Sequence, residues 1–411
     1  MSKGAMAYVL ADNIISPLGD TSEGNYFAVK CGKSGIQSFV KGSHDIPDGF
    51  VASLLSRDFE SLVLESVQKT LETSQLDVAH SKVVFILSST KGLVERLGKN
   101  SDEHIYLGQV AESIAQKIGI FTKPIVVCNA CISGLSALIL ASRLLTAGKY
   151  DYAVVCGCDC PDRFIISGFQ SLKALSSEPC RPFDMERLGL NLGEAAATIL
   201  LSREVPLRLT GNIWQISHGF IRNDAFHISA PSKTSDGLYK ALKETCSGVD
   251  KDKLAFVNAH GTATLFNDQM ESIAIQRAGL SDIPINALKG YFGHTLGAAG
   301  VLETILSMKA VDDHTIIGTR GYEEAGVSGK IDISADNRST DKLSFIKMLS
   351  GFGGCNATIF VSKDNSILSA KECSVPFALK KTHQVKISAN EVVVDGQQLF
   401  LRNKNMSSSL L

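Results

Sequence analysis

Two kinds of apolar pattern alternate along the chain. In the first, short runs of consecutive apolar and often β-branched residues occur, as in the buried strands of a parallel sheet. Such runs lie at residues 82–87, 125–127, 151–156, 195–201, 254–259 and 283–288. In the second, apolar residues recur every three or four positions, as at 59–71 and 110–118, which predicts helices. The alternation therefore predicts an α/β protein with a mainly parallel sheet.

Cys131 follows the apolar run at 125–127, and the residues after it, 132–140, are small, apolar and helical in pattern. We therefore expect this cysteine at a junction between a buried strand and a helix. Unpaired amides and the positive end of the helix dipole would lower the pKa of a thiol there and could bind an oxyanion. Cysteine is also a common core residue, so packing is the alternative interpretation of this position.

The second half of the chain contains a stretch with the same layout. His294 follows a strand pattern, Gly297 comes three residues later, and a helix rich in small residues follows, just as Gly134 follows Cys131. This internal repeat predicts two halves related by a pseudo-twofold axis, with Cys131 and His294 at the starts of equivalent helices that could meet near that axis. Glycine and alanine at 297–300 would let the two helices pack closely.

A second histidine, His260, follows the apolar run at 254–259 and precedes polar and turn-forming residues. It is expected at the carboxyl end of a strand, where open α/β sheets bind their ligands. The turn Gly351-Phe352-Gly353-Gly354 needs backbone angles that favour glycine and could bring amides close to a substrate. An isolated histidine is more often a surface or core residue, but two histidines and a cysteine that all follow strands favour a shared site.

The composition is that of a globular protein, with 411 residues, 44% hydrophobic, 20% charged and a net charge of −1 at pH 7. A nearly neutral chain gives no reason to expect nucleic acid or an anionic membrane as a partner. The N-terminus has no long apolar segment, and no stretch approaches the roughly 20 apolar residues of a membrane span, so we expect a cytoplasmic protein. Ten cysteines scattered through apolar segments are typical of reduced thiols.

Together these pieces resemble the β-ketoacyl-ACP synthase family of the thiolase superfamily, in its Cys-His-His elongating branch. The residues that carry the resemblance are Asn129-Ala130-Cys131, the stretch 258–264 with Asn267-Asp268, the stretch 289–300 with Glu303, and the stretch 351–356. Weaker matches lie at 181–184, 192–196, 224–227 and Pro231. The resemblance extends over residues 5 to 362, in the family's order.

The resemblance implies a thiolase fold, in which two pseudo-symmetric βαβαβαββ halves form a five-layered αβαβα core. The implied domains are an N-terminal half at 1–205 with the nucleophilic cysteine and a C-terminal half at 206–362 with both catalytic histidines. Residues 363–411 would form a C-terminal tail. Within it, alternation at 392–400 around Asp395-Gly396 predicts a small β-hairpin.

The resemblance also implies a reaction, the decarboxylative Claisen condensation of an acyl thioester with malonyl-ACP in fatty acid or in polyketide or pigment-type biosynthesis. Cys131 would carry the acyl group, and His260 and His294 would stabilise the enolate formed on loss of carbon dioxide. Lys289, paired with Glu303, would order His294. The amides of Cys131 and Phe352 would form an oxyanion hole, with Phe352 as a gate. The other implied site residues are Glu303 and Asp268 as supports, and Thr262, Thr264 and Ser229 as substrate-binding residues.

No metal and no free cofactor are implied, because the substrates travel on the phosphopantetheine arm of acyl carrier protein. Acyl carrier protein is therefore the implied partner. Related synthases also pair through an interface beside the cysteine helix, so the chain would form either a homodimer or a heterodimer with a related synthase or a chain-length-factor-like subunit.

Three alternatives stay open. The spacing of Cys128 and Cys131, with the cysteines at 156–160, is compatible with zinc or redox chemistry, although cysteines inside apolar runs favour core packing. A CoA-dependent thiolase without decarboxylation gains some support from Cys355 beside the glycine turn. A non-catalytic chain-length factor would lack the nucleophile, which this chain keeps. Ser350 stands where the family usually has a second phenylalanine, so the acyl preference stays open.

Overall fold

The computed structural model describes residues 6–79, 82–96, 105–205 and 213–363, and the backbone of three short strands farther on. The chain divides into two compact units, residues 1–373 and 374–411. In the second unit, β17 (Val385–Ile387), β18 (Val392–Val394) and β19 (Gln397–Leu399) pair antiparallel, with β18 in the middle. The strands β18 and β19 coincide with the two strands expected for the tail hairpin.

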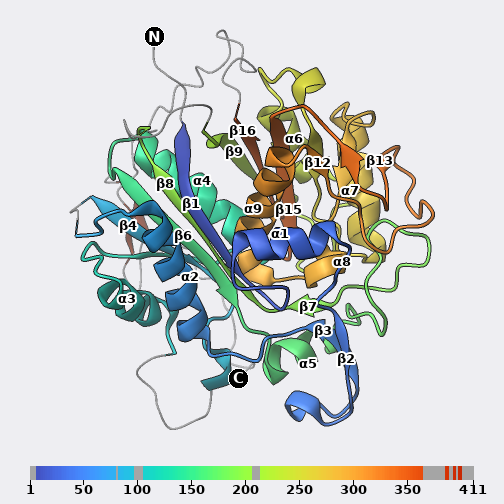
Figure 1. Ribbon diagram of the computed structural model, residues 1–411, viewed down its shortest axis with the longest axis horizontal. Helices are drawn as coiled ribbons and strands as arrows, with labels where there is room; N and C mark the ends of the chain where they lie inside the picture. Colours follow the sequence, from blue (N-terminus) through green and yellow to red (C-terminus); the bar gives the residue numbers. More distant parts are fainter. Residues whose placement is uncertain are drawn as a thin grey trace. The chain divides into compact units, whose positions relative to one another are not determined.

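An eleven-stranded sheet runs through the first unit, in the order β13-β11-β10-β15-β16-β9-β1-β8-β6-β4-β5 (Figure 1). Its strands are β1 (Ala7–Ile15), β4 (Val83–Ser88), β5 (Ile125–Val127), β6 (Tyr152–Asp159), β8 (Ala195–Ser202), β9 (Gln215–Asn223), β10 (Phe256–Asn258), β11 (Pro284–Asn286), β13 (Asp332–Ile333), β15 (Ser344–Gly351) and β16 (Cys355–Ser362). Smaller sheets contain β2 (Gln37–Phe39), β3 (Phe50–Ser53) and β7 (Leu192–Gly193), and β12 (Thr315–Ile316) with β14 (Arg338–Ser339).

The predicted α/β architecture is confirmed, but the sheet is mixed rather than mainly parallel. Pairs such as β4 with β6 and β10 with β15 are parallel, whereas β15 with β16, β16 with β9 and β6 with β8 are antiparallel. Apolar runs mark buried strands whatever their direction. The short connection between β15 and β16 forces an antiparallel pair, because a parallel pair needs a crossover of a dozen residues or more.

The sheet consists of two halves with the same topology. Numbered along the chain within each half, the strands run third, second, fourth, fifth, first across the sheet, as β5-β4-β6-β8-β1 and as β11-β10-β15-β16-β9. The two first strands join the halves, since β1 pairs antiparallel with β9 through Ala7 opposite Ile216 and Tyr8 opposite Gln215. The predicted internal repeat is thereby confirmed. The domain boundary at residue 205 stays a prediction, because both halves belong to one sheet of one compact unit.

Three layers of helices enclose the two halves of the sheet. The outer layers pack α2 and α3 on the first half and α6 and α7 on the second, while α4 and α9 lie between the halves (Figure 1). Alternate residues of a strand face different layers: in β4, Ile86 packs toward the central helices and Phe85 toward α2 and α3. This is the predicted five-layered αβαβα core. The helices are α1 (Ser22–Lys30), α2 (Phe59–Ser74), α3 (Leu107–Lys117), α4 (Ser133–Thr146), α5 (Arg163–Ser171), α6 (Asp236–Thr245), α7 (Leu265–Arg277), α8 (Lys289–Phe292) and α9 (Ala299–Asp312).

The central helices α4 and α9 approach each other so closely that only glycine fits at their contact. A Cβ atom on Gly300 would stand 2.3 Å from the amide nitrogen of Leu135, and one on Gly134 would stand 2.8 Å from the carbonyl oxygen of Gly297. The expected role of the small residues at 297–300 is confirmed. The close contact brings the starts of the two helices together, and with them the segments that carry Cys131 and His294.

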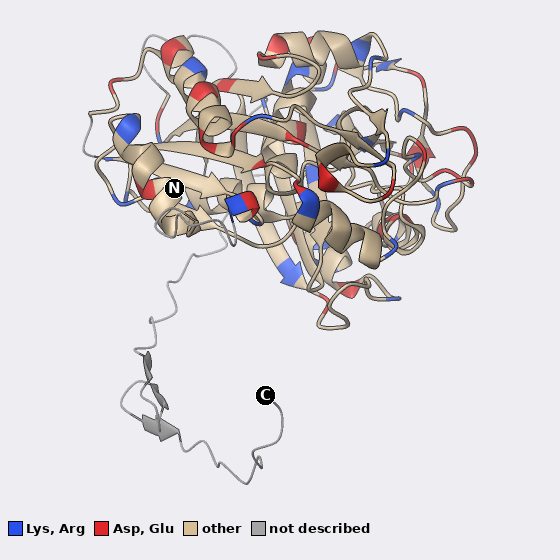
Figure 2. Ribbon diagram, turned by 90° about the horizontal axis from the view of Figure 1, so that it is seen from below, with Lys and Arg blue, Asp and Glu red and all other residues tan. Residues whose placement is uncertain are grey.

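Charged residues of both signs are distributed over the described part of the chain, as expected from its small net charge (Figure 2). Among the helices of the described residues, none has the length and apolar character required to cross a lipid bilayer.

Candidate active site

Cys131 lies in a tight turn between β5 and α4. Ala130, directly before it, has a φ of +45°, a left-handed conformation that is unfavourable for a residue with a side chain. Ser133 at the start of α4 holds this turn, because its Oγ accepts from the amide of Asn129 at 2.8 Å and donates to the carbonyl of Ala130 at 2.6 Å. The turn directs the Cys131 side chain into the interior, where the residue is 7% exposed.

His260 follows β10 by two residues, and buried charged side chains hold its backbone. The carboxylate of Glu271 on α7 accepts from the amides of His260 and Gly261, and the ammonium of Lys289 donates to the carbonyl of His260 at 2.7 Å. Charge-assisted hydrogen bonds of this kind are stronger than neutral ones. The backbone of His260 is therefore fixed on both its donor and its acceptor side.

His294 lies between α8 and α9. Its amide donates to the carbonyl of Asn191 at 2.7 Å, and its carbonyl accepts from the amide of Gly193 in β7 at 2.9 Å. Its ring Nδ1 accepts from the amide of Leu296 at 3.3 Å. A neutral imidazole that accepts at Nδ1 carries its proton on Nε2. Nε2 of His294 is buried and has no hydrogen-bond partner among the described residues, and the same is true of Nδ1 of His260.

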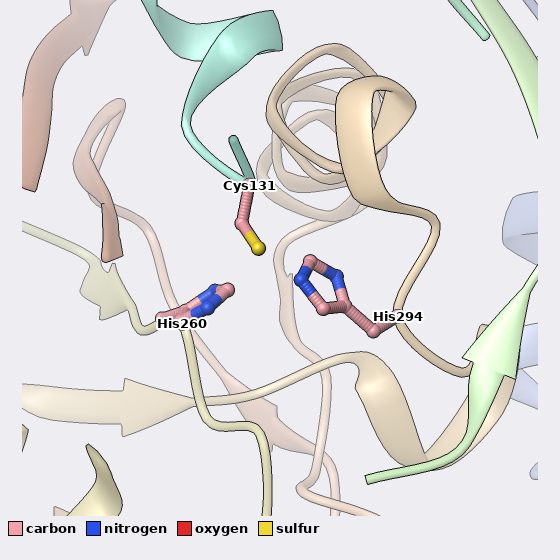
Figure 3. Close-up of side chains that lie close together, drawn as sticks. All are labelled: Cys131, His260 and His294. Carbon is pink, nitrogen blue, oxygen red and sulfur yellow. The ribbon is translucent and has the colours of Figure 1, made fainter. Parts of the chain in front are cut away.

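The structure brings Cys131, His260 and His294 together (Figure 3). The Cys131 sulfur and one nitrogen of each ring all lie within 4.8 Å of one another. The ring centroids of the two histidines are 5.0 Å apart, with an interplanar angle of 80°. The meeting of Cys131 and His294 at the starts of two equivalent helices, expected from the internal repeat, is thus present in the structure.

Burial keeps both imidazoles uncharged. Loss of hydration holds the pKa of His260 and that of His294 well below the usual 6.5, and the positive charge of Lys289 lowers both further. A neutral imidazole can donate a hydrogen bond to an oxygen that becomes negative without first giving up a proton.

The expected lowering of the Cys131 pKa is wrong. Burial raises the pKa of the thiol to about 11, and this effect outweighs the opposing influence of Lys289 and of the Phe352 amide, which hydrogen-bonds the cysteine. α4 begins only at Ser133, with Ile132 as its N-cap. The resting cysteine is therefore a thiol at neutral pH.

Lys289 and Glu303 form the predicted pair, with Nζ and Oε1 2.6 Å apart and both side chains buried. Lys289 was expected to order His294, but its second hydrogen bond goes to the carbonyl of His260. Asp268 is also buried and supports the loop after His260, since it accepts from the amides of Phe183, Thr262 and Ala263.

A cavity of about 400 Å³ opens onto the three side chains. Thr262, Thr264 and Ser229 line it, as expected, and the two threonine hydroxyls are hydrogen-bonded at 2.9 Å. Phe352 also lines it, stacked on Phe169 of α5 with ring centroids 5.8 Å apart. The remaining lining is mostly apolar, from Leu172, Leu188, Ile228, Leu265 and Phe266 among others.

Three buried ionisable residues near the site were missed by the sequence analysis. Glu271 lies one helical turn after Asp268 on the same face of α7. Because Asp268 was expected to support the site, this spacing was a signal that could have identified Glu271. Asp159, at the end of β6, accepts from the amides of Thr90 and Gly297 and links the two halves. The third is Lys347, which pairs with Glu303.

The cysteines proposed as zinc ligands do not gather into a site. Within the described residues, the single group of histidine, cysteine and acidic side chains close enough to hold a metal ion is Cys131 with His260 and His294. Cys156 and Cys158 are buried in β6 as expected, but Cys128 is exposed rather than part of the core. It directly follows β5, which lies at the edge of the sheet. That no metal is required stays a prediction.

Two family models match the chain: the beta-ketoacyl synthase N-terminal domain over residues 57–206 and the beta-ketoacyl synthase C-terminal domain over residues 215–323. Together they cover more than half of the sequence and include Cys131, His260 and His294. The chain belongs to the β-ketoacyl synthase family. The resemblance inferred from the sequence motifs is thereby confirmed.

This β-ketoacyl synthase has several curated relatives. It is 33% identical to 3-oxoacyl-(acyl-carrier-protein) synthase 2 of Rhizobium meliloti over 253 residues, which are 58% of this chain and 60% of that protein. It is 25% identical to the Coxiella burnetii protein of the same name over 399 residues, 85% of this chain and 96% of that protein. It is 29% identical to the tetracenomycin polyketide synthase ketoacyl synthase alpha subunit of Streptomyces glaucescens, over 62% of this chain and 63% of that protein.

Solved structures confirm the fold of this synthase. A ketosynthase from Xenorhabdus doucetiae, in complex with its chain length factor, has a TM-score of 0.75 at 24% identity and covers 88% of this chain and 98% of its own. A beta-ketoacyl synthase from Burkholderia phymatum has a TM-score of 0.75 at 21% identity and covers 88% and 99%. The predicted thiolase fold is therefore confirmed.

Proposed function

We propose that this synthase condenses an acyl thioester with malonyl-ACP, with loss of carbon dioxide, to give a 3-oxoacyl-ACP. The observation that carries the proposal is the group of one sulfur and two imidazole nitrogens, all within 4.8 Å of one another, beside a cavity of about 400 Å³. Relatives named 3-oxoacyl-(acyl-carrier-protein) synthase and polyketide synthase ketoacyl synthase support it. Fatty acid and polyketide or pigment-type substrates are both compatible with it.

In the first half-reaction, the Cys131 sulfur attacks the acyl thioester of the donor carrier protein. The bond between the acyl carbon and the pantetheine sulfur breaks, the acyl group passes to Cys131, and the thiol proton passes to the released pantetheine sulfur. Negative charge on the thioester oxygen would be received by the amides of Cys131 and Phe352. The hydrogen bond between the Phe352 amide and the cysteine supports this role for Phe352.

In the second half-reaction, malonyl-ACP loses carbon dioxide, and the electron pair of the broken bond forms an enolate. His294, through the proton on Nε2, and His260 would donate to the enolate oxygen. The enolate carbon then attacks the thioester on Cys131, and the carbon–sulfur bond breaks. Its electron pair stays on the Cys131 sulfur, which takes up a proton from solvent to restore the thiol, and the 3-oxoacyl product remains on the carrier protein. The uncharged state of both rings and the unpartnered nitrogens support this division of roles.

The surrounding residues would hold the substrate and the histidines. We assign Thr262, Thr264 and Ser229 to the pantetheine arm or the malonyl carboxylate because they line the cavity. Lys289, Glu303 and Asp268 would act as supports, since they contact the backbone around His260 or one another.

The substrates would arrive on the phosphopantetheine of acyl carrier protein, with no other cofactor, in the cytoplasm. A homodimer or a heterodimer is proposed. Two structural relatives were solved with a chain length factor, and one polyketide synthase structure contains the acyl carrier protein with its ketosynthase. A catalytic subunit that requires a chain-length-factor-like partner is the second candidate, and a purified chain that condenses only when such a subunit is added would favour it.

The experiment that tests the proposal compares two condensations with the same acyl primer. Purified protein is supplied either with malonyl-ACP or with acetyl-CoA, and the 3-oxoacyl product and carbon dioxide are measured. We expect product and an equal amount of carbon dioxide with malonyl-ACP. Product from acetyl-CoA alone, without carbon dioxide, would instead identify a thiolase-type enzyme.

A further inference from the structure

Lys347 is a buried lysine in the middle of a strand, flanked on both sides by apolar residues. It lies on β15 between Ile346 and Met348, and its side chain is 0% exposed. Its neighbours on the same face, Phe345 and Leu349, pack in the core around the central helices. Burial of an ammonium group costs several kcal/mol unless it is paired and hydrogen-bonded. An apolar side chain would be the stable choice at this position, so the lysine calls for an explanation beyond stability.

The ammonium of Lys347 meets two groups of the active site. Nζ donates to Oε2 of Glu303 at 2.5 Å and to the carbonyl of Ala259 at 3.0 Å. Lys289 uses the other oxygen of Glu303 and the next carbonyl, that of His260. One carboxylate thus holds two ammonium groups, and these bind two consecutive carbonyls of the segment that carries His260.

We propose that Lys347 is a positioning residue of the active site, which together with Lys289 fixes the carbonyls of Ala259 and His260 and so holds the His260 ring toward Cys131. Glu271 fixes the amides of His260 and Gly261 from the other side. Removal of Lys347 would leave the Ala259 carbonyl without this partner. The expected loss of rate rests on the proposed condensation, whereas the expected change in the pKa of the two histidines does not.

Lys347 also contributes positive charge beside both histidines. It lowers the pKa of His260 and of His294, in addition to burial and Lys289. Around it stand Glu303 on α9, Lys289 on α8 and Glu271 on α7. Burial is the main cause that lowers the pKa of Lys347 itself to about 8. As the pH rises through about 8, the ammonium loses its proton and the charge-assisted hydrogen bonds weaken.

The test isolates the second half-reaction. Enzyme already acylated on Cys131 is mixed with malonyl-ACP, and product formation in a single turnover is followed from acidic to alkaline pH. Two variants are compared, Lys347→Met, which keeps the length of the side chain, and Lys347→Gln, which keeps a donor without charge. The control is Lys309→Met on α9, which removes a lysine paired with Asp12 and Glu23 away from the cavity.

We expect Lys347→Met to lower the single-turnover rate at least tenfold and to leave the KM for malonyl-ACP within twofold. The decline of the wild-type rate above pH 8 should be absent in both variants at position 347. Their rate should also fall at a higher pH on the acid side, because the histidines lose a neighbouring positive charge. Lys309→Met should show the same declines on the acid and alkaline sides as wild type. A wild-type rate in Lys347→Met, or a lower rate with both declines unchanged, would overturn the proposal.

A second measurement keeps the inference separate from the proposed function. If wild-type protein forms no product with any acyl donor, the condensation proposal fails, and the histidines are then titrated by NMR with ¹³C-labelled imidazoles. The variants His260→Asn and His294→Asn assign the two signals. We expect both rings to titrate at higher pH in Lys347→Met and unchanged in Lys309→Met. Unchanged titration in Lys347→Met would contradict the inference.

Discussion

The two halves of the sheet place different residues at the same register position beside the active site. In the first half, the last pair between β4 and β6 is Ser88 opposite Gly157. In the second half, the last pair between β10 and β15 is Asn258 opposite Lys347. A Cβ atom on Gly157 would stand 2.8 Å from the carbonyl oxygen of Gly297, so backbone from the second half occupies that position.

This difference separates the work of the halves. The first half contributes the thiol, in a setting of small side chains and close backbone contact. The second half contributes both imidazoles, the buried charges of Lys289, Glu303 and Lys347, and the buried carboxyl group of Glu271, whose pKa is raised to about 7 by burial. One fold repeated twice thus holds a nucleophile in one copy and groups that stabilise negative charge in the other. Asp159 of the first half contacts the second half, because its carboxyl group accepts a hydrogen bond from the amide of Gly297.

The largest expected effect comes from removal of the Cys131 thiol, which the first half contributes. Cys131→Ala should lower condensation by more than about 10³-fold, because no other group can carry the acyl chain. The fold should persist, since alanine is smaller and the turn is held by Ser133. Product formation and circular dichroism check these two points. Wild-type turnover by this variant would refute the assignment of the nucleophile.

Removal of His294, which the second half contributes, should slow decarboxylation more than acylation. His294→Ala should slow decarboxylation of malonyl-ACP by about 10²- to 10³-fold, because a donor to the enolate oxygen is lost. Acylation of Cys131 should fall much less, since its oxyanion is received by backbone amides. Carbon dioxide release and the rate of adduct formation are measured separately. If decarboxylation were unchanged, or both steps slowed equally, the separation between the halves would be wrong.

The contact between α4 and α9 can be tested through the free energy of unfolding. Gly300→Ala places a Cβ atom 2.3 Å from the Leu135 amide nitrogen, a backbone clash that should destabilise the protein by about 1–3 kcal/mol or more. The matched control is Gly168→Ala on α5, where a Cβ atom meets nothing within 4 Å and should stabilise the helix by about 0.5–1 kcal/mol. Urea unfolding compares the two. Equal stability of both variants would contradict the close packing of α4 and α9.

The smallest expected effect is on the pH dependence of the free energy of unfolding. The pKa of His260 and of His294 lies well below 6.5 in the native state, so the unfolded chain binds more protons as the pH falls below 6.5. The free energy of unfolding should therefore decrease below pH 6.5. The double variant His260→Asn with His294→Asn should show a shallower decrease in urea unfolding between pH 7 and 5. Parallel curves would mean that the two rings are not buried in the uncharged form.

Much of the fold and the three central side chains could be predicted from the sequence, because they leave local signals. Apolar runs marked the strands, and Cys131 and His294 stood at matching places of two similar segments. The pKa of Cys131 could not be predicted, since burial by distant segments outweighs the local helix. Lys347 was missed because a lysine inside an apolar strand gives no local sign of its partners. Its carboxylate comes from α9, and its second partner is a backbone carbonyl.

The most direct measurement of the central claim is intact-protein mass spectrometry after incubation with a panel of acyl carrier proteins. We predict one acyl adduct, mapped by peptide analysis to Cys131, which disappears when malonyl-ACP is added and a 3-oxoacyl-ACP appears. The preferred acyl group would be identified in the same experiment. No adduct with any donor, or an adduct on another cysteine such as Cys128 or Cys355, would contradict it.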